Sequence, residues 1–108
     1  MSAPTQLEGV AVGTKANVFF DGRCVSHTVT FADGTRKSCG VILPGSGSIT
    51  FDVGAAEVMQ TVAGECEVKR TGEDAFTRYG EGQSFDVPAN TSFEIRVATP
   101  YHYICHFG

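Results

Sequence analysis

The feature that most constrains the fold of this chain is an alternation of apolar and polar side chains in short runs, separated by glycine and proline. The clearest alternating sets, each on one face of an expected strand, are Val25, His27, Val29 and Phe31, and later Phe93, Ile95 and Val97. Because successive side chains of a β-strand point to opposite faces, a period of two predicts strands. No segment has the roughly 3.6-residue period of an amphipathic helix. The sequence therefore predicts an all-β fold, either a sandwich or a barrel.

Turn signals divide the chain into its expected strands. Asp33-Gly34 and Ala63-Gly64 are each interpreted as hairpin turns. Strands are expected at residues 25–31, 36–43, 49–53, 57–62, 65–69, 76–79, 84–87, 93–97 and 101–107. The first 16 residues are small and polar, so we expect an N-terminal arm there that is poorly ordered or forms an edge segment. The remaining 17–108 are expected to form one β-barrel domain.

Composition and charge limit the expected binding partners and cellular compartment of the protein. The 108 residues carry a net charge of −4 and no Lys/Arg-rich run, which argues against nucleic-acid binding. No apolar run approaches the roughly 18 residues of a membrane helix, and the N-terminus does not have the pattern of a signal peptide. The four cysteines form no C-x-x-C pair, so we expect free, mostly buried thiols and a cytoplasmic protein. A barrel this small exposes sheet edges, and we expect a homodimer.

The spacing of several glycines, one glutamate and one proline matches a known pattern. Five residues separate Gly45 from Phe51-x-Val53, three more lead to Glu57, and six more lead to Gly64. Five residues also separate Gly82 from Pro88. This spacing resembles the two sequence motifs of the cupin superfamily, G-x5-H-x-H-x3-4-E-x6-G and G-x5-P-x-G-x2-H. In these positions the glycines suit sharp connections where positive φ is needed. The resemblance implies a jelly-roll β-barrel.

The metal-ligand positions of this pattern do not hold metal ligands. A metal-binding cupin uses three histidines and one glutamate, but here the histidine positions hold Phe51, Val53 and Phe93. Only Glu57 remains, and one carboxylate cannot replace the three or four ligands that such sites need. We therefore expect no metal. The three histidines of the chain fall elsewhere and are expected to be ordinary strand residues: His27, His102 and His106.

Aromatic residues at these positions suggest another use of the barrel interior. Phe51 and Phe93 would project inward where a metal would otherwise sit, and Tyr79 and Tyr103 are expected nearby. Such rings either fill the core or line a flat slot that accepts an aromatic ligand by stacking. A carboxylate among them is costly unless it is paired or hydrogen-bonded, which makes Glu57 the first residue to suspect of ligand contact.

Beyond the superfamily pattern, residues 17–107 resemble a particular family. The segments T-R-K-S-C-G-V-I-L-P-G-S-G-S-I-T-F and E-V-M-Q-T-V-A-G-E, together with F-D-V-P and Y-I-C-H-F, are similar to the small cupin-type pyrimidine/purine nucleoside phosphorylases. The resemblance implies phosphorolysis, in which nucleoside and inorganic phosphate give a free base and a pentose 1-phosphate. It also implies broad base preference and no cofactor other than the phosphate co-substrate.

The chemistry of this reaction indicates which residues could perform it. The sugar gains oxocarbenium character as the glycosidic bond lengthens. Glu57 could stabilise that charge and bind sugar hydroxyls. Arg36 could hold phosphate, with Ser38 on the same strand face. We therefore assign catalytic roles to Glu57 and Arg36, and substrate binding to Ser38, Phe51, Tyr79, Phe93 and Tyr103.

Two alternatives stay open from the sequence. In the first, the same pocket binds a small molecule without turning it over. In the second, the protein is a metal enzyme with unusual ligands, drawn from His27, His102 or His106 together with Glu57.

Overall fold

In the computed structural model, residues 3–107 form eleven strands in two antiparallel sheets and one short 3-10 helix, η1 (Phe20–Gly22). The larger sheet contains β1 (Val10–Val12), β2 (Asn17–Phe19), β3 (Cys24–Phe31), β4 (Arg36–Ile42), β6 (Glu57–Ala63), β9 (Ser84–Val87) and β11 (Tyr101–Phe107). The smaller sheet contains β5 (Ile49–Val53), β7 (Cys66–Arg70), β8 (Thr77–Tyr79) and β10 (Thr91–Arg96).

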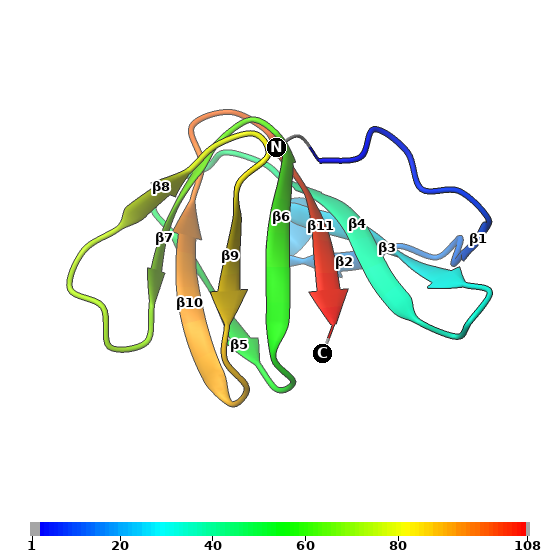
Figure 1. Ribbon diagram of the computed structural model, residues 1–108. Coiled ribbons are helices and arrows are strands. Elements are labelled where there is room, and N and C mark those ends of the chain that lie inside the picture. Colours follow the sequence, from blue (N-terminus) through cyan, green and yellow to red (C-terminus); the bar gives the residue numbers. More distant parts are fainter. Residues whose placement is uncertain (1–2, 108) are drawn as a thin grey trace.

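The two sheets curve around a common interior (Figure 1). The larger sheet has the order β1-β3-β4-β11-β6-β9, and β2 also pairs with β3. The smaller sheet has the order β5-β10-β7-β8. No strand ladder joins the two sheets within the described part of the chain, so the jelly roll is an open barrel. The all-β jelly-roll prediction is confirmed.

One of the two predicted hairpins is present and the other is not. Asp33-Gly34 connects β3 to β4, which pair with each other, and Gly34 has φ +88°. Gly64 also has a positive φ, +81°, but β6 and β7 lie in different sheets. The hairpin prediction at Ala63-Gly64 is therefore wrong: the chain crosses there from one sheet to the other. A Cβ at Gly64 would lie 2.5 Å from the carbonyl oxygen of Pro100, so the crossing is too tight for a side chain.

Glycine is required at the cupin-motif positions for different physical reasons. Gly82, like Gly64, has a positive φ, +84°. Gly45 does not, although the sequence suggested that it would. A Cβ at Gly45 would lie 2.6 Å from Nε of Arg23, so glycine is needed there because the Arg23 guanidinium lies against the backbone. Asn90 stands where the second cupin motif has glycine and has φ +59°, a conformation that asparagine tolerates.

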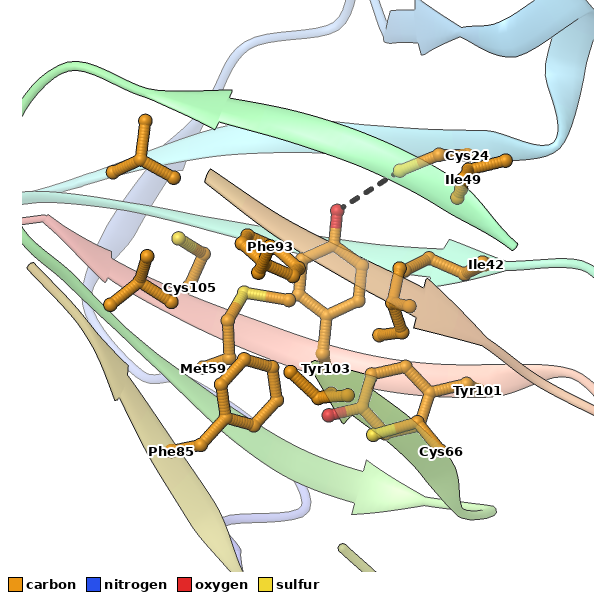
Figure 2. Packing of buried hydrophobic residues seen from close by; sticks show 14 residues of the cluster. Cys24, Ile42, Ile49, Met59, Cys66, Phe85, Phe93, Tyr101, Tyr103 and Cys105 are labelled. Atoms are coloured by element: carbon orange, nitrogen blue, oxygen red, sulfur yellow. Dashed lines mark hydrogen bonds between the residues drawn. The ribbon is translucent and has the colours of Figure 1, made fainter. Parts of the chain in front are cut away.

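The hydrophobic core fills the space between the smaller sheet and the β4-β11-β6 part of the larger one. Tyr101, Val68 and Ile95 are fully buried. The hydroxyls of Thr61 and Tyr101 lie 2.9 Å apart, which satisfies two polar groups in this core. Figure 2 shows Tyr103 in the middle of the cluster, surrounded by Phe93, Met59 and Ile42. All four cysteines are free, as expected, and three of them are buried: Cys24, Cys66 and Cys105.

The N-terminal segment lies against the outer face of the larger sheet. Residues 4–7 line a space of about 440 Å³ together with Val10, Val12 and residues of β3, β4, β6 and β11. Within the segment, β1 pairs with β3 and forms the edge of the larger sheet, and Ala3 is buried. An edge segment is thus present among the first 16 residues. No helix in residues 3–107 is long and apolar enough to cross a membrane.

Candidate active site

A cavity of about 360 Å³ lies between the two sheets. The larger sheet forms its floor, and β5 and β10 of the smaller sheet contribute Phe51, Asp52 and Phe93. The other lining residues are Asn17, Phe19, Ser26, Thr28, Ser38, Ile42, Glu57, Met59, Tyr103, Cys105 and Phe107. Five of the seven residues proposed from sequence are therefore in one place: Glu57, Ser38, Phe51, Phe93 and Tyr103.

Strand register arranges the floor in rows across the sheet. Thr28 faces Ser38 across the β3-β4 ladder, and Ser38 in turn faces Cys105 on β11. Ser26, Gly40 and Tyr103 form the next row in the same way. Because residues two apart on a strand share a face, Ser26, Thr28 and Ser38 all direct their hydroxyls toward the cavity.

The hydroxyl side chains form a polar wall in an otherwise apolar interior. Ser26 and Ser38 are only 4% and 7% exposed. The Asn17 amide nitrogen lies 3.3 Å from Ser26 Oγ and 3.4 Å from Thr28 Oγ1, and it donates to both. Buried hydroxyls of this kind bind groups with several hydrogen-bonding oxygens, such as a sugar or a phosphate. Of these hydroxyl-bearing residues, only Ser38 was predicted from the sequence to bind substrate.

Two acidic residues line the cavity, Asp52 and Glu57, and Glu57 is the one predicted from the cupin spacing. It begins β6 and faces Phe107 across the β6-β11 ladder. Burial raises the pKa of the Glu57 carboxyl, and a hydrogen bond with the Cys105 thiol partly opposes the rise. Burial, followed by the nearby Glu57 carboxylate, raises the pKa of Cys105 to about 12. The thiol therefore stays protonated and can donate to Glu57, so the carboxylate has one neutral donor beside it.

Arg36 lies at the edge of the cavity and does not line it. It is exposed at the start of β4, where it borders a neighbouring depression that shares Thr28 and Phe107 with the cavity. Lys37 on β4 pairs with His106 on β11, so the preceding residue, Arg36, lies next to Phe107. Phe107 in turn pairs with Glu57 on β6, so Arg36 and Glu57 lie in the same row across the sheet. Only β11 separates β4 from β6, so the backbones of Arg36 and Glu57 are about 10 Å apart.

The guanidinium of Arg36 is available to a ligand. The four ion pairs found within residues 3–107 do not include it. Lys37, in contrast, points to the other face, where its ammonium lies 5.0 Å from the centre of the Phe31 ring. Arg78 and Arg96 pair with Glu65 and Glu67.

The predicted aromatic residues divide between the cavity and the core. Phe51 and Phe93 are cross-strand partners whose rings stack with centroids 5.4 Å apart. Tyr103 borders the cavity, and its hydroxyl lies 3.3 Å from the Cys24 sulfur (Figure 2). Tyr79 does not line the cavity: its ring packs on Phe85, and Arg70 donates to its hydroxyl at 3.0 Å.

The residues around Glu57 do not fit a metal ion. The positions that carry metal ligands in other cupins hold the stacked rings of Phe51 and Phe93 and the buried Val53. In the described residues, no group of three or more His, Cys, Asp or Glu side chains is placed to hold a metal.

The histidines lie away from the cavity. His27 and His102 line the space beneath the N-terminal segment, on the opposite face of the larger sheet from Glu57. His27 Nδ1 is 2.9 Å from the carbonyl oxygen of Gly13, and His106 Nε2 is 2.9 Å from Gln60 Oε1. The positions of His27 and His102 argue against a metal that they share with Glu57, whereas His106 borders one depression with Glu57 and has its Nε2 beside Gln60.

Several cavity residues were not anticipated from the sequence. Ser26 and Thr28 alternate with the apolar residues of β3, so period two could have placed them together. Without the tertiary structure, however, nothing indicated that this polar face was the inner one. Phe19 lies outside the quoted motifs, and Phe107 ends the segment Y-I-C-H-F but was not predicted to have a role in the site.

Comparison with known structures defines the class of protein. A crystal structure of an RmlC-like cupin from Shewanella frigidimarina superposes with a TM-score of 0.69 at 19% identity, over 96% of this chain and 93% of that one. A protein of unknown function from Acinetobacter sp. ADP1 superposes with a TM-score of 0.94 at 43% identity, over 95% and 98%. The fold is that of a cupin with an interior pocket between two sheets.

Sequence comparison then places the chain within that class. The family model of pyrimidine/purine nucleoside phosphorylase matches residues 14–107. A pyrimidine/purine nucleoside phosphorylase from Thiobacillus denitrificans is 63% identical over 105 residues, which are 96% of this chain and 99% of that protein. One from Azoarcus sp. is 60% identical over 109 residues and the full length of both. The chain belongs to the pyrimidine/purine nucleoside phosphorylase family.

Proposed function

We propose that this protein cleaves purine and pyrimidine nucleosides with inorganic phosphate, without a metal ion, and that Glu57 and Arg36 perform the chemistry. The observation that carries the proposal is the half-buried carboxylate of Glu57, which shares one cavity with the hydroxyls of Ser38 and Thr28. Membership of the phosphorylase family supplies the reaction.

The reaction requires one bond to break and one to form at the anomeric carbon. The carbon–nitrogen bond to the base breaks, and its electron pair leaves with the base, which takes up a proton from phosphate or water. A phosphate oxygen forms the new bond, giving the pentose 1-phosphate. Positive charge develops on the sugar between these events, and a fixed carboxylate lowers its energy.

The cavity offers a place for each part of this reaction. Glu57 is positioned to accept hydrogen bonds from sugar hydroxyls and to face the developing charge. The wall of Ser26, Thr28 and Ser38 supplies further hydrogen bonds to the sugar. Arg36, at the same end of the sheet as Glu57, can hold a phosphate bidentately at the opening.

A metal is not needed for this scheme. Glu57 and Arg36 together provide charge of both signs, and the stacked pair Phe51–Phe93 offers no donor atom to a metal.

The proposal is tested by incubating purified protein with uridine or inosine in the presence and absence of inorganic phosphate. Phosphate-dependent release of uracil or hypoxanthine, with ribose 1-phosphate in equal amount, supports it. Nucleoside binding without release of base at any phosphate concentration would instead indicate a binding protein.

Two further proposals concern the setting of the enzyme. We infer a homodimer because the larger sheet has open edges and exposes apolar side chains such as Val12 and Val18, 54% and 59% exposed. Sedimentation at several concentrations would test this. We also infer a cytoplasmic location, supported by the free thiols, which a reducing compartment preserves.

A further inference from the structure

A strained turn stands beside the cavity. Immediately after β2, Phe20, Asp21 and Gly22 have φ values of +53°, +54° and +93°. Glycine adopts such values freely and aspartate tolerates them, but a bulky residue such as phenylalanine rarely does. Strain of this kind persists only where surrounding contacts maintain it, and it gathers at ligand sites.

The contacts that maintain the turn come from Arg23. Its backbone nitrogen donates to the Phe20 carbonyl at 3.1 Å, and its own carbonyl accepts from the Leu43 nitrogen at 2.6 Å. Its guanidinium lies against Gly45 and reaches the carbonyl oxygens of Ser46 and Gly47. The turn is thus anchored to the loop between β4 and β5.

The turn leaves two large rings open to solvent. Phe19 and Phe20 are 45% and 42% exposed, although each contacts the Phe51 ring edge-to-face, with centroids 6.2 and 5.1 Å apart. Such a contact occupies at most one face of a ring, so aromatic surface remains free on both.

The aromatic pair Phe51–Phe93 offers less open surface than Phe19 and Phe20, because Phe51 is only partly exposed and Phe93 is buried. Phe93 is 2% exposed, with Phe51 stacked on it and Phe85 against it at 5.7 Å. Phe19 lines the cavity, and Phe20 lies beside it against the Phe51 ring, so the exposed aromatic surface next to this end of the cavity is on these two residues.

The turn and Arg36 lie at opposite ends of the cavity, along β3. Phe19 pairs with Cys24 at one end of β3, whereas Thr30, near the other end, pairs with Arg36. At about 3.3 Å per residue, these two ends are about 20 Å apart. The hydroxyls of Ser26 and Thr28 lie between them. From Phe19 the cavity leads past the hydroxyls to the charged end, where a further exposed ring, Phe107, lies beside Arg36. Counted from Phe19, the order of ring, hydroxyls and charge is also the order of base, sugar and phosphate in the reacting complex.

We propose that Phe19 and Phe20 form the platform on which the nucleobase stacks, so that the sugar lies over Ser26 and Thr28. This rests on the proposed function, because it assumes that the ligand is a nucleoside. Stacking uses the face of a base and not its hydrogen-bonding edge, so the platform accepts purines and pyrimidines alike.

The test uses variants that remove the rings without unfolding the turn. Phe20→Gly removes one ring and also relieves the backbone strain, so its melting temperature should not fall. Phe19→Leu keeps apolar bulk but removes the aromatic face. Phe20→Tyr keeps the ring. Val18→Ala is the matched control, because Val18 precedes Phe19 on β2 and its side chain therefore points to the opposite face.

We expect Phe20→Gly and Phe19→Leu to raise KM for inosine and uridine by about tenfold or more, the scale of one lost stacking contact. KM for phosphate should change by less than about twofold, and Phe20→Tyr and Val18→Ala should resemble the wild type. Folded variants of both residues with unchanged nucleoside KM would overturn the platform.

Equilibrium dialysis of inosine without phosphate separates this proposal from the proposed function. Wild-type binding that weakens in Phe20→Gly and Phe19→Leu supports the platform even if no phosphorolysis is found. Equal binding by wild type and variants, or no binding by the wild type, overturns it.

Discussion

The ring of Tyr103 lies directly over Gly40, its partner across the β4-β11 ladder. A Cβ at Gly40 would lie 2.7 Å from the Tyr103 hydroxyl oxygen and 2.8 Å from the ring carbon that bears it. It would also lie 2.8 Å from Cβ of Ser26. Glycine at position 40 therefore lets one aromatic side chain cover the floor of the cavity next to the hydroxyl wall.

Gly40→Ala should destabilise the protein by about 1–3 kcal/mol, the usual cost of forcing an extra carbon into a packed interior. Gly54→Ala is the control, because no neighbouring atom lies within 4 Å of a Cβ there, and its stability should be unchanged or slightly raised. Urea unfolding measures both. In a Tyr103→Phe background, which lacks the closest contact, Gly40→Ala should cost less; strictly additive effects would contradict this explanation.

Glu57→Gln should lower kcat by roughly 100-fold, because it keeps the size of the side chain but removes the charge that faces the sugar. Steady-state phosphorolysis of inosine measures the loss in kcat. The control is Gln60→Glu, the opposite exchange at a neighbouring position on β6 that does not line the cavity, and its kcat should be unchanged. A folded Glu57→Gln enzyme with wild-type kcat would leave Glu57 with a structural role only.

The pKa of Glu57 also predicts how stability depends on pH. Burial raises that pKa, so the folded chain holds the proton to higher pH than the unfolded chain does. The contribution of Glu57 to stability is therefore most favourable below its unfolded pKa and is lost as the pH rises through the folded one. Glu57→Gln stays neutral, so its melting temperature relative to wild type should increase from about pH 4 to pH 8. A constant difference would show that Glu57 ionises normally.

Arg36→Lys should raise KM for phosphate much more than KM for nucleoside, because lysine cannot make the two parallel hydrogen bonds of a guanidinium. Arg36→Ala should nearly abolish phosphorolysis and leave the melting temperature within a few degrees, since Arg36 is exposed. The experiment varies phosphate at saturating nucleoside, with Lys37→Ala as the control on the opposite face. Normal phosphate dependence in Arg36→Ala would refute the assignment.

Prolonged treatment with EDTA should leave phosphorolysis unchanged, because Phe51, Val53 and Phe93 provide no metal-binding atoms at the cupin ligand positions. Activity is measured before and after dialysis against the chelator. Loss of activity that zinc or manganese restores would show that a metal takes part through other groups.

Period-two alternation and motif spacing were sufficient to predict much of this structure. They predicted the all-β fold, most strands and the β3-β4 turn at Asp33-Gly34, because strand direction and turn conformation depend on neighbouring residues. They also indicated the interior position of Glu57, Phe51 and Phe93, since cupin spacing assigns residues to the inner face.

Pairing between distant segments was decided only by the tertiary structure. Ala63-Gly64 has the composition of a hairpin, yet it crosses between sheets because β6 finds its partners in β9 and β11. The sequence also did not indicate which face of β3 is the inner one. Val29 is buried on the outer side, beside the N-terminal segment, so Ser26 and Thr28 face the cavity. Alternation determines that two faces differ, but burial of each face depends on which distant segment packs against it.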